Sequence, residues 1–329
     1  MGKKAFTFAR LQIGMNDSLI PFLLRDMGYD VLNIDDRVWL WNRSNSFFYK
    51  FLMKIFKHFF IKNMNRFILN EIDGVPFDFA FIFKGQHLSI NVIKILKKNG
   101  AKIVIFYPDL EPWSHSKEYL EICRYADYFV HTKPNLHKEM AQKVRHDAIC
   151  MPHSYYSSEI VNPLSLNKDI DVSFIGHYSK KKYKSLMHLH NLVKCNIHVY
   201  GDRWPLKNTK NIFFHEATYG FKIKDIISRS KVSLGFLMES LSGEFQGDAL
   251  TSRSILVPIF GTLCLHERNE FSKQLYEDEN ILFSDIYELA EKINKIIKKR
   301  DSYLTLALNQ QQQVVNKVKS FESILNTFI

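Results

Sequence analysis

The sequence has only four cysteines among its 329 residues, and no two of them lie close together. They form no CxxC pair, and no histidine stands at a spacing that suits zinc. Neither a disulfide framework nor a metal site is therefore indicated. We expect reduced thiols, as in a cytoplasmic protein.

Long apolar runs are also missing. No run approaches the roughly 20 residues that a membrane-spanning helix needs. The first residues, Met-Gly-Lys-Lys-Ala-Phe-Thr, lead into a strand-like run and have no long apolar core followed by small residues. We therefore expect neither a secretory signal nor a membrane-spanning anchor, and a cytoplasmic location.

Acidic residues are outnumbered by basic ones, which gives a formal net charge of +11. Such a surface attracts phosphates, nucleic acid or anionic lipid. No helix-turn-helix, RNA-recognition or zinc-finger pattern is present, and the lysines are spread over the whole chain. We therefore expect no specific nucleic-acid partner.

Short β-rich runs alternate with amphipathic stretches from one end of the chain to the other. The first half carries them at residues 5–9, 30–34, 79–83, 102–107, 128–131 and 148–151, and the second half at 171–176, 196–200, 212–215, 231–236, 259–265 and 281–283. This alternation predicts parallel sheets covered by helices on both faces. Ligands of such sheets bind beyond the carboxyl ends of the strands.

The length favours two domains. A polar piece at residues 154–168, which contains Pro163, interrupts the alternation and is interpreted as a linker. We therefore predict Rossmann-like domains over residues 1–155 and 169–300. A C-terminal helical segment over 301–329 follows, for which packing back across the first domain is one option.

Residues 247–268 are the most informative stretch. They predict a polar loop, a helix carrying Thr251 and Arg253, a turn at Gly261 and an apolar strand. An arginine in the first turn of a helix lies beside backbone N–H groups without partners, and both attract phosphate. The alternative is an ordinary helix–strand unit with a surface arginine.

An ordered series of motifs resembles a known family. The first half contains Phe-Ile-Phe-Lys-Gly at 81–85, an apolar run ending in Tyr-Pro-Asp at 100–109, and Tyr-Phe-Val-His-Thr at 128–132. The second half contains Asp-Val-Ser-Phe-Ile-Gly at 171–176 and Val-Tyr-Gly at 199–201, then Trp204, Tyr219, Thr251, Arg253, Pro258, Gly261 and Glu267. The series resembles the CgeB-like glycosyltransferases. These have the α/β GT-B fold, in which two Rossmann-like domains face an interdomain cleft and the C-terminal half resembles group-1 glycosyltransferases.

The resemblance implies transfer of a sugar from a nucleotide-sugar donor to a glycan, lipid-linked or protein acceptor. It places the donor diphosphate near Gly176 and Arg253. The other expected donor-binding residues are Tyr200, Gly201, Trp204, Tyr219, Thr251 and Glu267. Simpler interpretations are turn glycines, packed aromatic rings, and a Glu267 carboxylate paired with Arg268.

The sequence departs from the family pattern at one position. Related sequences commonly have a glutamate where this chain has Leu256, and a leucine cannot accept a hydrogen bond. Either Glu267 or Glu244 takes over, or the donor is held differently. The departure also motivates the alternative of a non-catalytic GT-B-fold protein that binds a glycan or a membrane.

No Asp-x-Asp motif follows a strand. The acidic run at residues 277–279 precedes a strand and is interpreted as a solvated turn. We predict chemistry without a metal or other cofactor, in which Arg253 and helix N-termini neutralise the leaving diphosphate.

The acceptor half requires a base if the reaction inverts configuration. Asp109 ends an apolar strand and is preferred over Asp17, which is also placed to cap a helix. His153 and His131 are weaker candidates. Lys84 follows a strand and is expected to contact a phosphate of the donor or acceptor.

No acidic residue lies between Asp36 and Glu71, a stretch rich in aromatic and basic residues. On a helix, Lys50, Lys54 and Lys57 fall on one flank, beside an aromatic stripe that includes Phe51. Two interpretations stay open. The helix lies on an anionic membrane surface, which suits a lipid-linked acceptor, or its stripe covers the first sheet.

Overall fold

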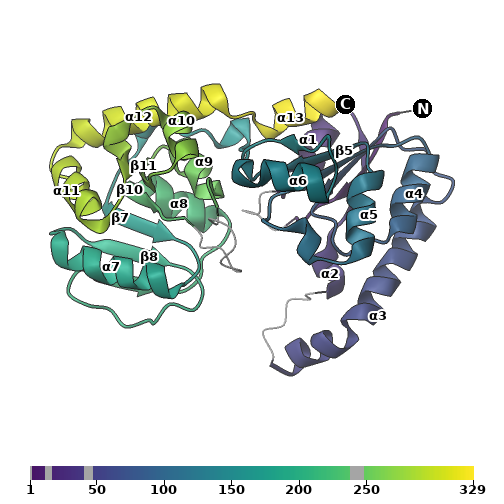
Figure 1. The fold of residues 1–329 in the computed structure, drawn as a ribbon, viewed down its shortest axis with the longest axis horizontal. Coiled ribbons are helices and arrows are strands. Elements are labelled where there is room, and N and C mark those ends of the chain that lie inside the picture. The colour runs from purple at the N-terminus through teal and green to yellow at the C-terminus, as the bar shows by residue number, and fades with distance from the viewer. Residues whose placement is uncertain (1, 12–16, 41–46, 238–247) are drawn as a thin grey trace. The chain divides into compact units, whose positions relative to one another are not determined.

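The chain folds as two α/β units, each built on a parallel six-stranded sheet (Figure 1). The computed structural model describes residues 2–11, 17–40, 47–237 and 248–329. One unit comprises Met1–Met151 and Ile324–Ile329, and the other comprises Pro152–Ser323. The predicted class, α/β with two Rossmann-like parallel sheets, is confirmed.

The first sheet has the strand order β2-β1-β3-β4-β5-β6. Its strands are β1 (Lys4–Phe8), β2 (Asp30–Ile34), β3 (Phe79–Phe83), β4 (Lys102–Tyr107), β5 (Tyr128–His131) and β6 (Ile149–Cys150). The unit's first six helices are α1 (Ile20–Asp26), α2 (Asp36–Leu40), α3 (Phe47–Ile72), α4 (Ile90–Lys98), α5 (Lys117–Tyr125) and α6 (His137–Lys143). The strand order reverses between β1 and β3, which is where ligands of such sheets bind.

The second sheet has the order β12-β11-β10-β7-β8-β9. Its strands are β7 (Ile170–Ile175), β8 (Ile197–Tyr200), β9 (Ile212–His215), β10 (Ser230–Gly235), β11 (Leu263–Glu267) and β12 (Leu282–Phe283). Helices α7 (Lys180–Leu192), α8 (Phe221–Arg229), α9 (Ser252–Ile259), α10 (Glu270–Tyr276), α11 (Ile286–Ile296) and α12 (Arg300–Lys317) follow, and α13 (Phe321–Phe328) ends the chain. Here the order reverses between β7 and β10.

The strands form where apolar residues run without interruption. Every residue of β3 is buried, as expected for a parallel strand covered on both faces. The predicted strand at 259–265 is shorter than expected, because Ile259 ends α9 and β11 begins at Leu263. Gly261 makes the turn between them with φ +75°, and a Cβ there would lie 2.8 Å from the carbonyl oxygen of Val161.

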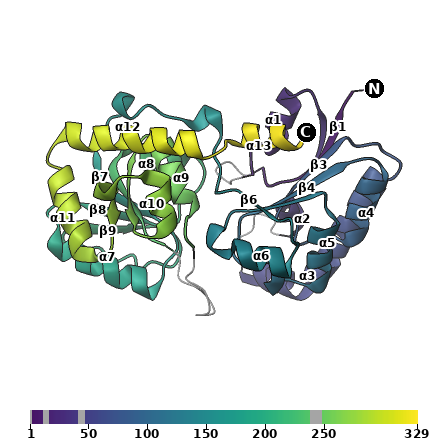
Figure 2. The ribbon, with the colours of Figure 1, turned by 45° about the horizontal axis from the view of Figure 1, so that its top comes forward.

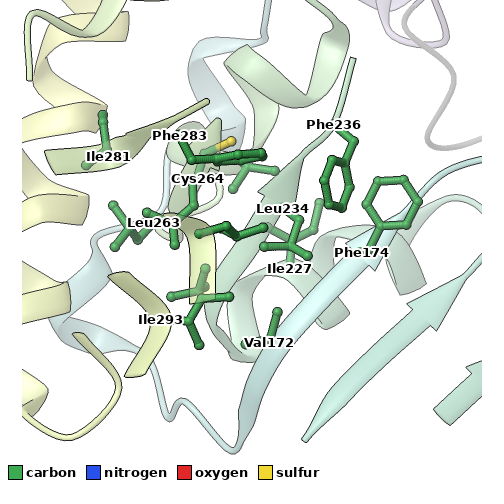
Figure 3. Packing of buried hydrophobic residues seen from close by; sticks show 14 of the residues in the cluster. Val172, Phe174, Ile227, Leu234, Phe236, Leu263, Cys264, Ile281, Phe283 and Ile293 are labelled. Atoms are coloured by element: carbon green, nitrogen blue, oxygen red, sulfur yellow. The ribbon is translucent and has the colours of Figure 1, made fainter. Parts of the chain in front are cut away.

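The core of the second unit lies between the sheet and its helices (Figure 3). Val172 and Leu234 of adjacent strands are fully buried and pack with Leu263 of β11 and Ile293 of α11. Toward the carboxyl ends of the strands the core becomes aromatic, since Phe174 contacts Phe236 edge-on. The carboxyl edge of the sheet therefore lies on buried, packed aromatic rings.

The long helix α12 belongs to the second unit, where it contacts α9, α10 and β11 (Figure 2). The side chain of Gln310 is buried and hydrogen-bonds both the N–H and the C=O of Cys264. Gln311 donates to the carbonyl oxygens of Val161 and Pro258. Only residues 324–329 group with the first unit, so the division differs from the predicted bounds of 155, 169 and 301.

Candidate functional site

The guanidinium of Arg253 lies where the strand order of the second sheet reverses. Helix α9 begins directly after Thr251, which puts Arg253 in its first turn as predicted. The Nη1 group donates to the carbonyl oxygen of Ile175 at the end of β7 (3.1 Å), and Nη2 donates to that of Phe236 just after β10 (2.9 Å). The side chain is thus turned inward across the carboxyl ends of both strands.

This arginine is a cation held by carbonyl groups. Its Nε–H has no hydrogen-bond partner among the described residues. Burial lowers the pKa of Arg253, yet a guanidinium stays charged because its ordinary pKa is so high. Its charge also lies over the ring of Phe174, 5.5 Å from the centroid. Such a partly buried cation suits an incoming anion.

Two glycines allow the backbone to approach this arginine. A Cβ on Gly176 would lie 3.1 Å from Nη1 of Arg253 and 3.0 Å from the ring of Phe174. Gly201, with φ +154°, passes so close to Gly176 that a Cβ would lie 2.0 Å from its carbonyl oxygen. Both predicted glycines therefore lie at the same edge of the sheet as Arg253, Gly176 after β7 and Gly201 after β8.

The predicted aromatic residues have different surroundings. Trp204 is buried and donates from Nε1 to the carbonyl oxygen of Gly176 (2.8 Å), so it supports the glycine turn. Tyr200 is half-buried and stacks on His215. Tyr219 is exposed, and its hydroxyl donates to Asp202 (3.1 Å). Among these rings Tyr219 is the most accessible.

A buried hydrogen-bond chain supports the start of α9. The N–H of Thr251 donates to Ser254 Oγ (2.9 Å), which lies 2.7 Å from Nε2 of His266. The His266 Nδ1 lies 2.7 Å from the carbonyl oxygen of Glu267, which can only accept. The proton of the neutral ring is therefore on Nδ1, and Ser254 donates to Nε2. Burial lowers the pKa of His266 to about 4, which keeps the ring neutral.

The carboxylate of Glu267 faces the same edge. It accepts a hydrogen bond from the N–H of Leu237 (2.7 Å) and lies 3.6 Å from Nζ of Lys181. Arg268 instead pairs with Glu279 and Glu288, so pairing between Glu267 and Arg268 is ruled out. The sequence did not reveal the roles of His266 and Lys181, since one lies inside a strand and the other in a run of surface lysines.

The neighbouring acidic run at 277–279 is engaged elsewhere. Glu277 pairs with Lys317, and Glu279 pairs with Arg268 and Lys273. The side chain of Leu256 packs against the core of the unit. Glu244, the other candidate replacement for the family glutamate, lies outside the described residues.

At the point where the strand order of the first sheet reverses, the arginine is paired with a carboxylate. Arg10 follows β1 and makes a two-point contact with Asp36, with distances of 2.9 and 3.1 Å. His87, after β3, lies 3.1 Å from the same carboxylate. Burial opposes ionisation, but hydrogen bonds from His87 and Arg10 lower the pKa of Asp36 to about 2. The Arg10 charge is thus neutralised within the unit.

Asp17 lies beside this network. Its side chain is buried and accepts a hydrogen bond from the N–H of Arg10 (2.7 Å). Burial raises the pKa of Asp17 to about 6, although Arg10 and Lys84 act in the opposite direction. This carboxyl group therefore titrates near neutral pH.

The residues Lys84 and Asp109 also meet at this edge. Nζ of Lys84 lies 2.8 Å from Oδ2 of Asp109, and the two side chains are 27% and 48% exposed. Lys84 has φ 62°, an uncommon conformation for a residue other than glycine, and its carbonyl oxygen accepts from Tyr119. The turn after β3 is therefore held in a fixed shape.

The two predicted histidines follow later strands of the first sheet than Asp109 does: His131 ends β5, and His153 comes after β6. His153 is buried. His131 lies with His137 and Cys150 in a group whose possible metal-ligand atoms are all within 4.8 Å. The N–H of Lys133 points at Nδ1 of His131, which puts the His131 proton on Nε2, 3.0 Å from His137. This arrangement is a hydrogen-bonded histidine pair, and Nε2 offers no lone pair to a metal ion.

Solved structures with 11–14% sequence identity share the fold of this chain. Sucrose-phosphate synthase from Thermosynechococcus elongatus matches with a TM-score of 0.62 and 11% identity, over 99% of this chain and 97% of that one. An alpha-glucosyltransferase in complex with UDP-glucose and DNA containing an abasic site matches with a TM-score of 0.60 and 13% identity, over 99% and 98%. T4 phage BGT in complex with UDP and Mn²⁺ matches with a TM-score of 0.53 and 14% identity, over 96% of both chains. The chain therefore has the GT-B fold.

The second unit carries the sequence match. A family model described as glycosyl transferase-like matches residues 181–324, which include Arg253 and Glu267. No curated protein matches the sequence at a significant level.

The residues predicted to contact a membrane lie on α3. Lys57 and Phe51 are exposed there, whereas Lys50 and Lys54 lie where side chains are not described.

Proposed function

We propose that this protein is a CgeB-like glycosyltransferase that moves a sugar from a nucleotide-sugar donor to a glycan, lipid-linked or protein acceptor at the cytoplasmic face of a membrane. One observation carries the proposal. The Arg253 guanidinium lies at the reversal point of the second sheet and is held there by carbonyl oxygens. Ligands of open α/β sheets bind at such points, and arginine matches phosphate geometry.

The donor diphosphate is the chemical group that fits this place. A guanidinium has five N–H groups, and two of those on Arg253 are used by Ile175 and Phe236. The remaining donors and the free N–H groups at the start of α9 can receive phosphate oxygens. Glu267 can accept hydrogen bonds from sugar hydroxyls. UDP-glucose and UDP are present in the structures of fold relatives.

The base that activates the acceptor is better supported at Asp17 than at Asp109. A general base works best when its pKa lies near the working pH. Burial brings the pKa of Asp17 to about 6, whereas Asp109 is half-exposed and held by Lys84. Asp109 and Lys84 are then placed to bind and orient the acceptor.

Metal-independent chemistry is part of the proposal. A fixed cation at the diphosphate position can take the role that a divalent ion has elsewhere, because both stabilise the negative charge of the leaving group. The acidic run at 277–279 supports this, since Glu277 and Glu279 are paired with basic side chains. One fold relative has Mn²⁺ bound with UDP, so the test includes both conditions.

Calorimetry with UDP, GDP and CMP tests the proposal, with and without Mn²⁺. At least one nucleotide is expected to bind in the presence of EDTA, and Arg253→Ala is expected to weaken binding about 100-fold, as for loss of charge-assisted hydrogen bonds. Arg229→Ala is the matched control, because Arg229 is an exposed arginine of the same unit that pairs with Asp169, before β7. The proposal would be contradicted if no nucleotide binds, or if Arg253→Ala binds nucleotide as tightly as Arg229→Ala does.

The position of Leu256 favours a second candidate, a non-catalytic GT-B-fold binding protein. The Leu256 side chain packs against the core of the unit. This chain therefore has no carboxylate at the position of the family glutamate to bind a ligand. Incubation with radiolabelled nucleotide sugars separates the two candidates. Hydrolysis or transfer dismisses the binding protein, whereas tight nucleotide binding without turnover of any donor supports it.

A further inference from the structure

The helix α3 has two parts with different surroundings. Its second half packs into the first unit, where Met64, Ile68 and Ile72 are fully buried. In its first half, residues 55–59 are all exposed, so no side of the helix is covered there. In Figure 1 this part extends beyond the helices that flank it in the first unit.

Large apolar side chains are exposed on this projecting part. Phe51 is 53% exposed, Ile55 56%, Phe56 49% and Phe59 59%. We refer to these four as the α3 apolar surface. A cluster of exposed phenylalanine and isoleucine side chains marks an interaction site, since isolated exposed apolar residues are common but clusters are not. The interpretation in which this stripe covers the first sheet does not apply to these four residues.

The charge around the α3 apolar surface has one sign. Lys57, Lys62 and Arg66 are exposed, and no acidic residue occurs between Asp36 and Glu71. A second copy of the chain would bring like charges together, which is unfavourable. An anionic surface complements them. Single-stranded nucleic acid is also anionic, but it binds aromatic rings by stacking, and the aliphatic side chain of Ile55 cannot stack.

One charge of the projecting part acts on a histidine elsewhere in the first unit. Burial lowers the pKa of His115, Asp109 raises it, and Lys84, His87 and Lys57 lower it. The charge of Lys57 therefore acts on the same histidine as Lys84 and Asp109. His115 is itself held by the hydroxyl of Tyr107 (3.1 Å).

We propose that the α3 apolar surface inserts into an anionic lipid bilayer while Lys57, Lys62 and Arg66 contact the lipid headgroups. Within the described residues, no helix has the length and apolarity to cross a bilayer, so α3 lies in the interface. Docking in this way holds the first unit, which carries Lys84 and Asp109, at the membrane surface. A lipid-linked acceptor with an anionic headgroup would be presented there; this last step alone rests on the proposed function.

Flotation with vesicles tests the docking on the full-length protein without nucleotide. We expect binding to phosphatidylcholine vesicles containing phosphatidylglycerol, much weaker binding to pure phosphatidylcholine, and loss of binding in high salt. Lys57→Glu/Lys62→Glu and Phe56→Ser/Phe59→Ser are each expected to reduce binding at least tenfold. Since all four side chains are exposed or partly exposed, thermal unfolding should be nearly unchanged.

The controls carry changes of the same kind in the second unit. Lys298→Glu/Lys299→Glu alters the net charge equally, and Phe221→Ser removes a ring that is 71% exposed. Both should bind vesicles like the unaltered protein. The proposal is overturned if anionic vesicles are not bound, if the α3 variants bind them normally, or if the α3 changes abolish binding to single-stranded DNA alone. Nucleotide affinity, measured separately, does not depend on any of these outcomes.

Discussion

The carboxyl edges of the two sheets each contain a reversal of the strand order, but the strand orders differ and so do the charges at the two edges. In the second unit the reversal point holds Arg253, each of whose Nη groups donates one hydrogen bond to a carbonyl oxygen. In the first unit the reversal point holds Arg10, which is already paired with Asp36, next to the buried carboxyl group of Asp17. Under the proposed function, the edge of the second sheet receives the anionic donor and the edge of the first sheet receives the proton of the acceptor. The same fold can therefore supply both halves of a transfer reaction, depending on which charges follow the strands.

The largest expected effect lies at the first edge. Asp17→Asn keeps the shape and the hydrogen bond from Arg10 but cannot take up a proton, so kcat should fall 10²–10⁴-fold, as is typical for loss of a general base. In the unaltered protein the carboxylate is the active form, so kcat/KM should rise with pH and level off above the pKa of about 6. A pH–rate profile with the preferred donor measures both.

The Asp109→Asn variant provides the comparison. It should raise KM for the acceptor more than it lowers kcat, because Asp109 is paired with Lys84 and is half-exposed. If Asp109→Asn abolishes turnover and Asp17→Asn does not, the assignment of the base reverses.

The next effect concerns a second buried cation of the second unit. Lys168 donates to the carbonyl oxygen of Gly261 (2.7 Å) and to Thr262 Oγ1 (2.8 Å), near the opposite edge of the sheet. Burial lowers the pKa of Lys168 from 10.5 to about 7. The folded state then binds fewer protons than the unfolded state between these values, so the free energy of unfolding should rise as pH increases from about 7 toward 10.5.

Urea unfolding at a series of pH values tests this, with Lys168→Met as the comparison. In the unaltered protein the free energy of unfolding should change by about a few kcal/mol over this pH range because of Lys168, and in Lys168→Met this change should be absent. Lys231→Met is a control that removes the charge of another lysine of the same unit, one that is paired with Asp171. Parallel pH curves for Lys168→Met and the unaltered protein would disprove this.

A smaller effect is expected at the turn beside Arg253. In Gly176→Ala the new Cβ would lie 3.1 Å from Nη1, which obliges the guanidinium to shift by a few tenths of an ångström. Nucleotide affinity should drop about tenfold, equivalent to about 1.4 kcal/mol, while the melting temperature changes little. Calorimetry and a thermal melt measure the two quantities. A variant with unchanged affinity would show that the ligand does not use this guanidinium.

The smallest effect concerns Trp204. Trp204→Phe keeps the packing against Phe174 and Phe214 but removes the hydrogen bond to Gly176. The free energy of unfolding should fall by about 1 kcal/mol, the usual contribution of one such bond. A loss of nucleotide affinity far larger than the loss of stability would instead support direct contact between Trp204 and the donor.

The strands could be predicted from the sequence because each is a short, continuous apolar run bounded by polar or glycine residues. Residues 79–83 and 102–107 were predicted with the bounds that the structure has. The juxtaposition of Gly176 and Arg253 was implied by the family resemblance, and the two residues do lie side by side.

The polar networks could not be predicted in the same way. The contact of Arg10 and His87 with Asp36 joins residues that follow three different strands, and it depends on register and on side-chain rotamers. His266 looks like an ordinary strand residue, and only its burial beside Ser254 shows its role. Periodicity indicates which face a residue lies on, but not which polar partner it meets there.

The last residues of the chain complete its first unit. Ile324 and Leu325 are fully buried there, and the ring of Phe328 lies 4.8 Å from that of Tyr128. A ribosome makes residues 152–323 before it reaches them. While residues 152–323 are being translated, the nascent first unit therefore lacks residues 324–329, which supply most of α13.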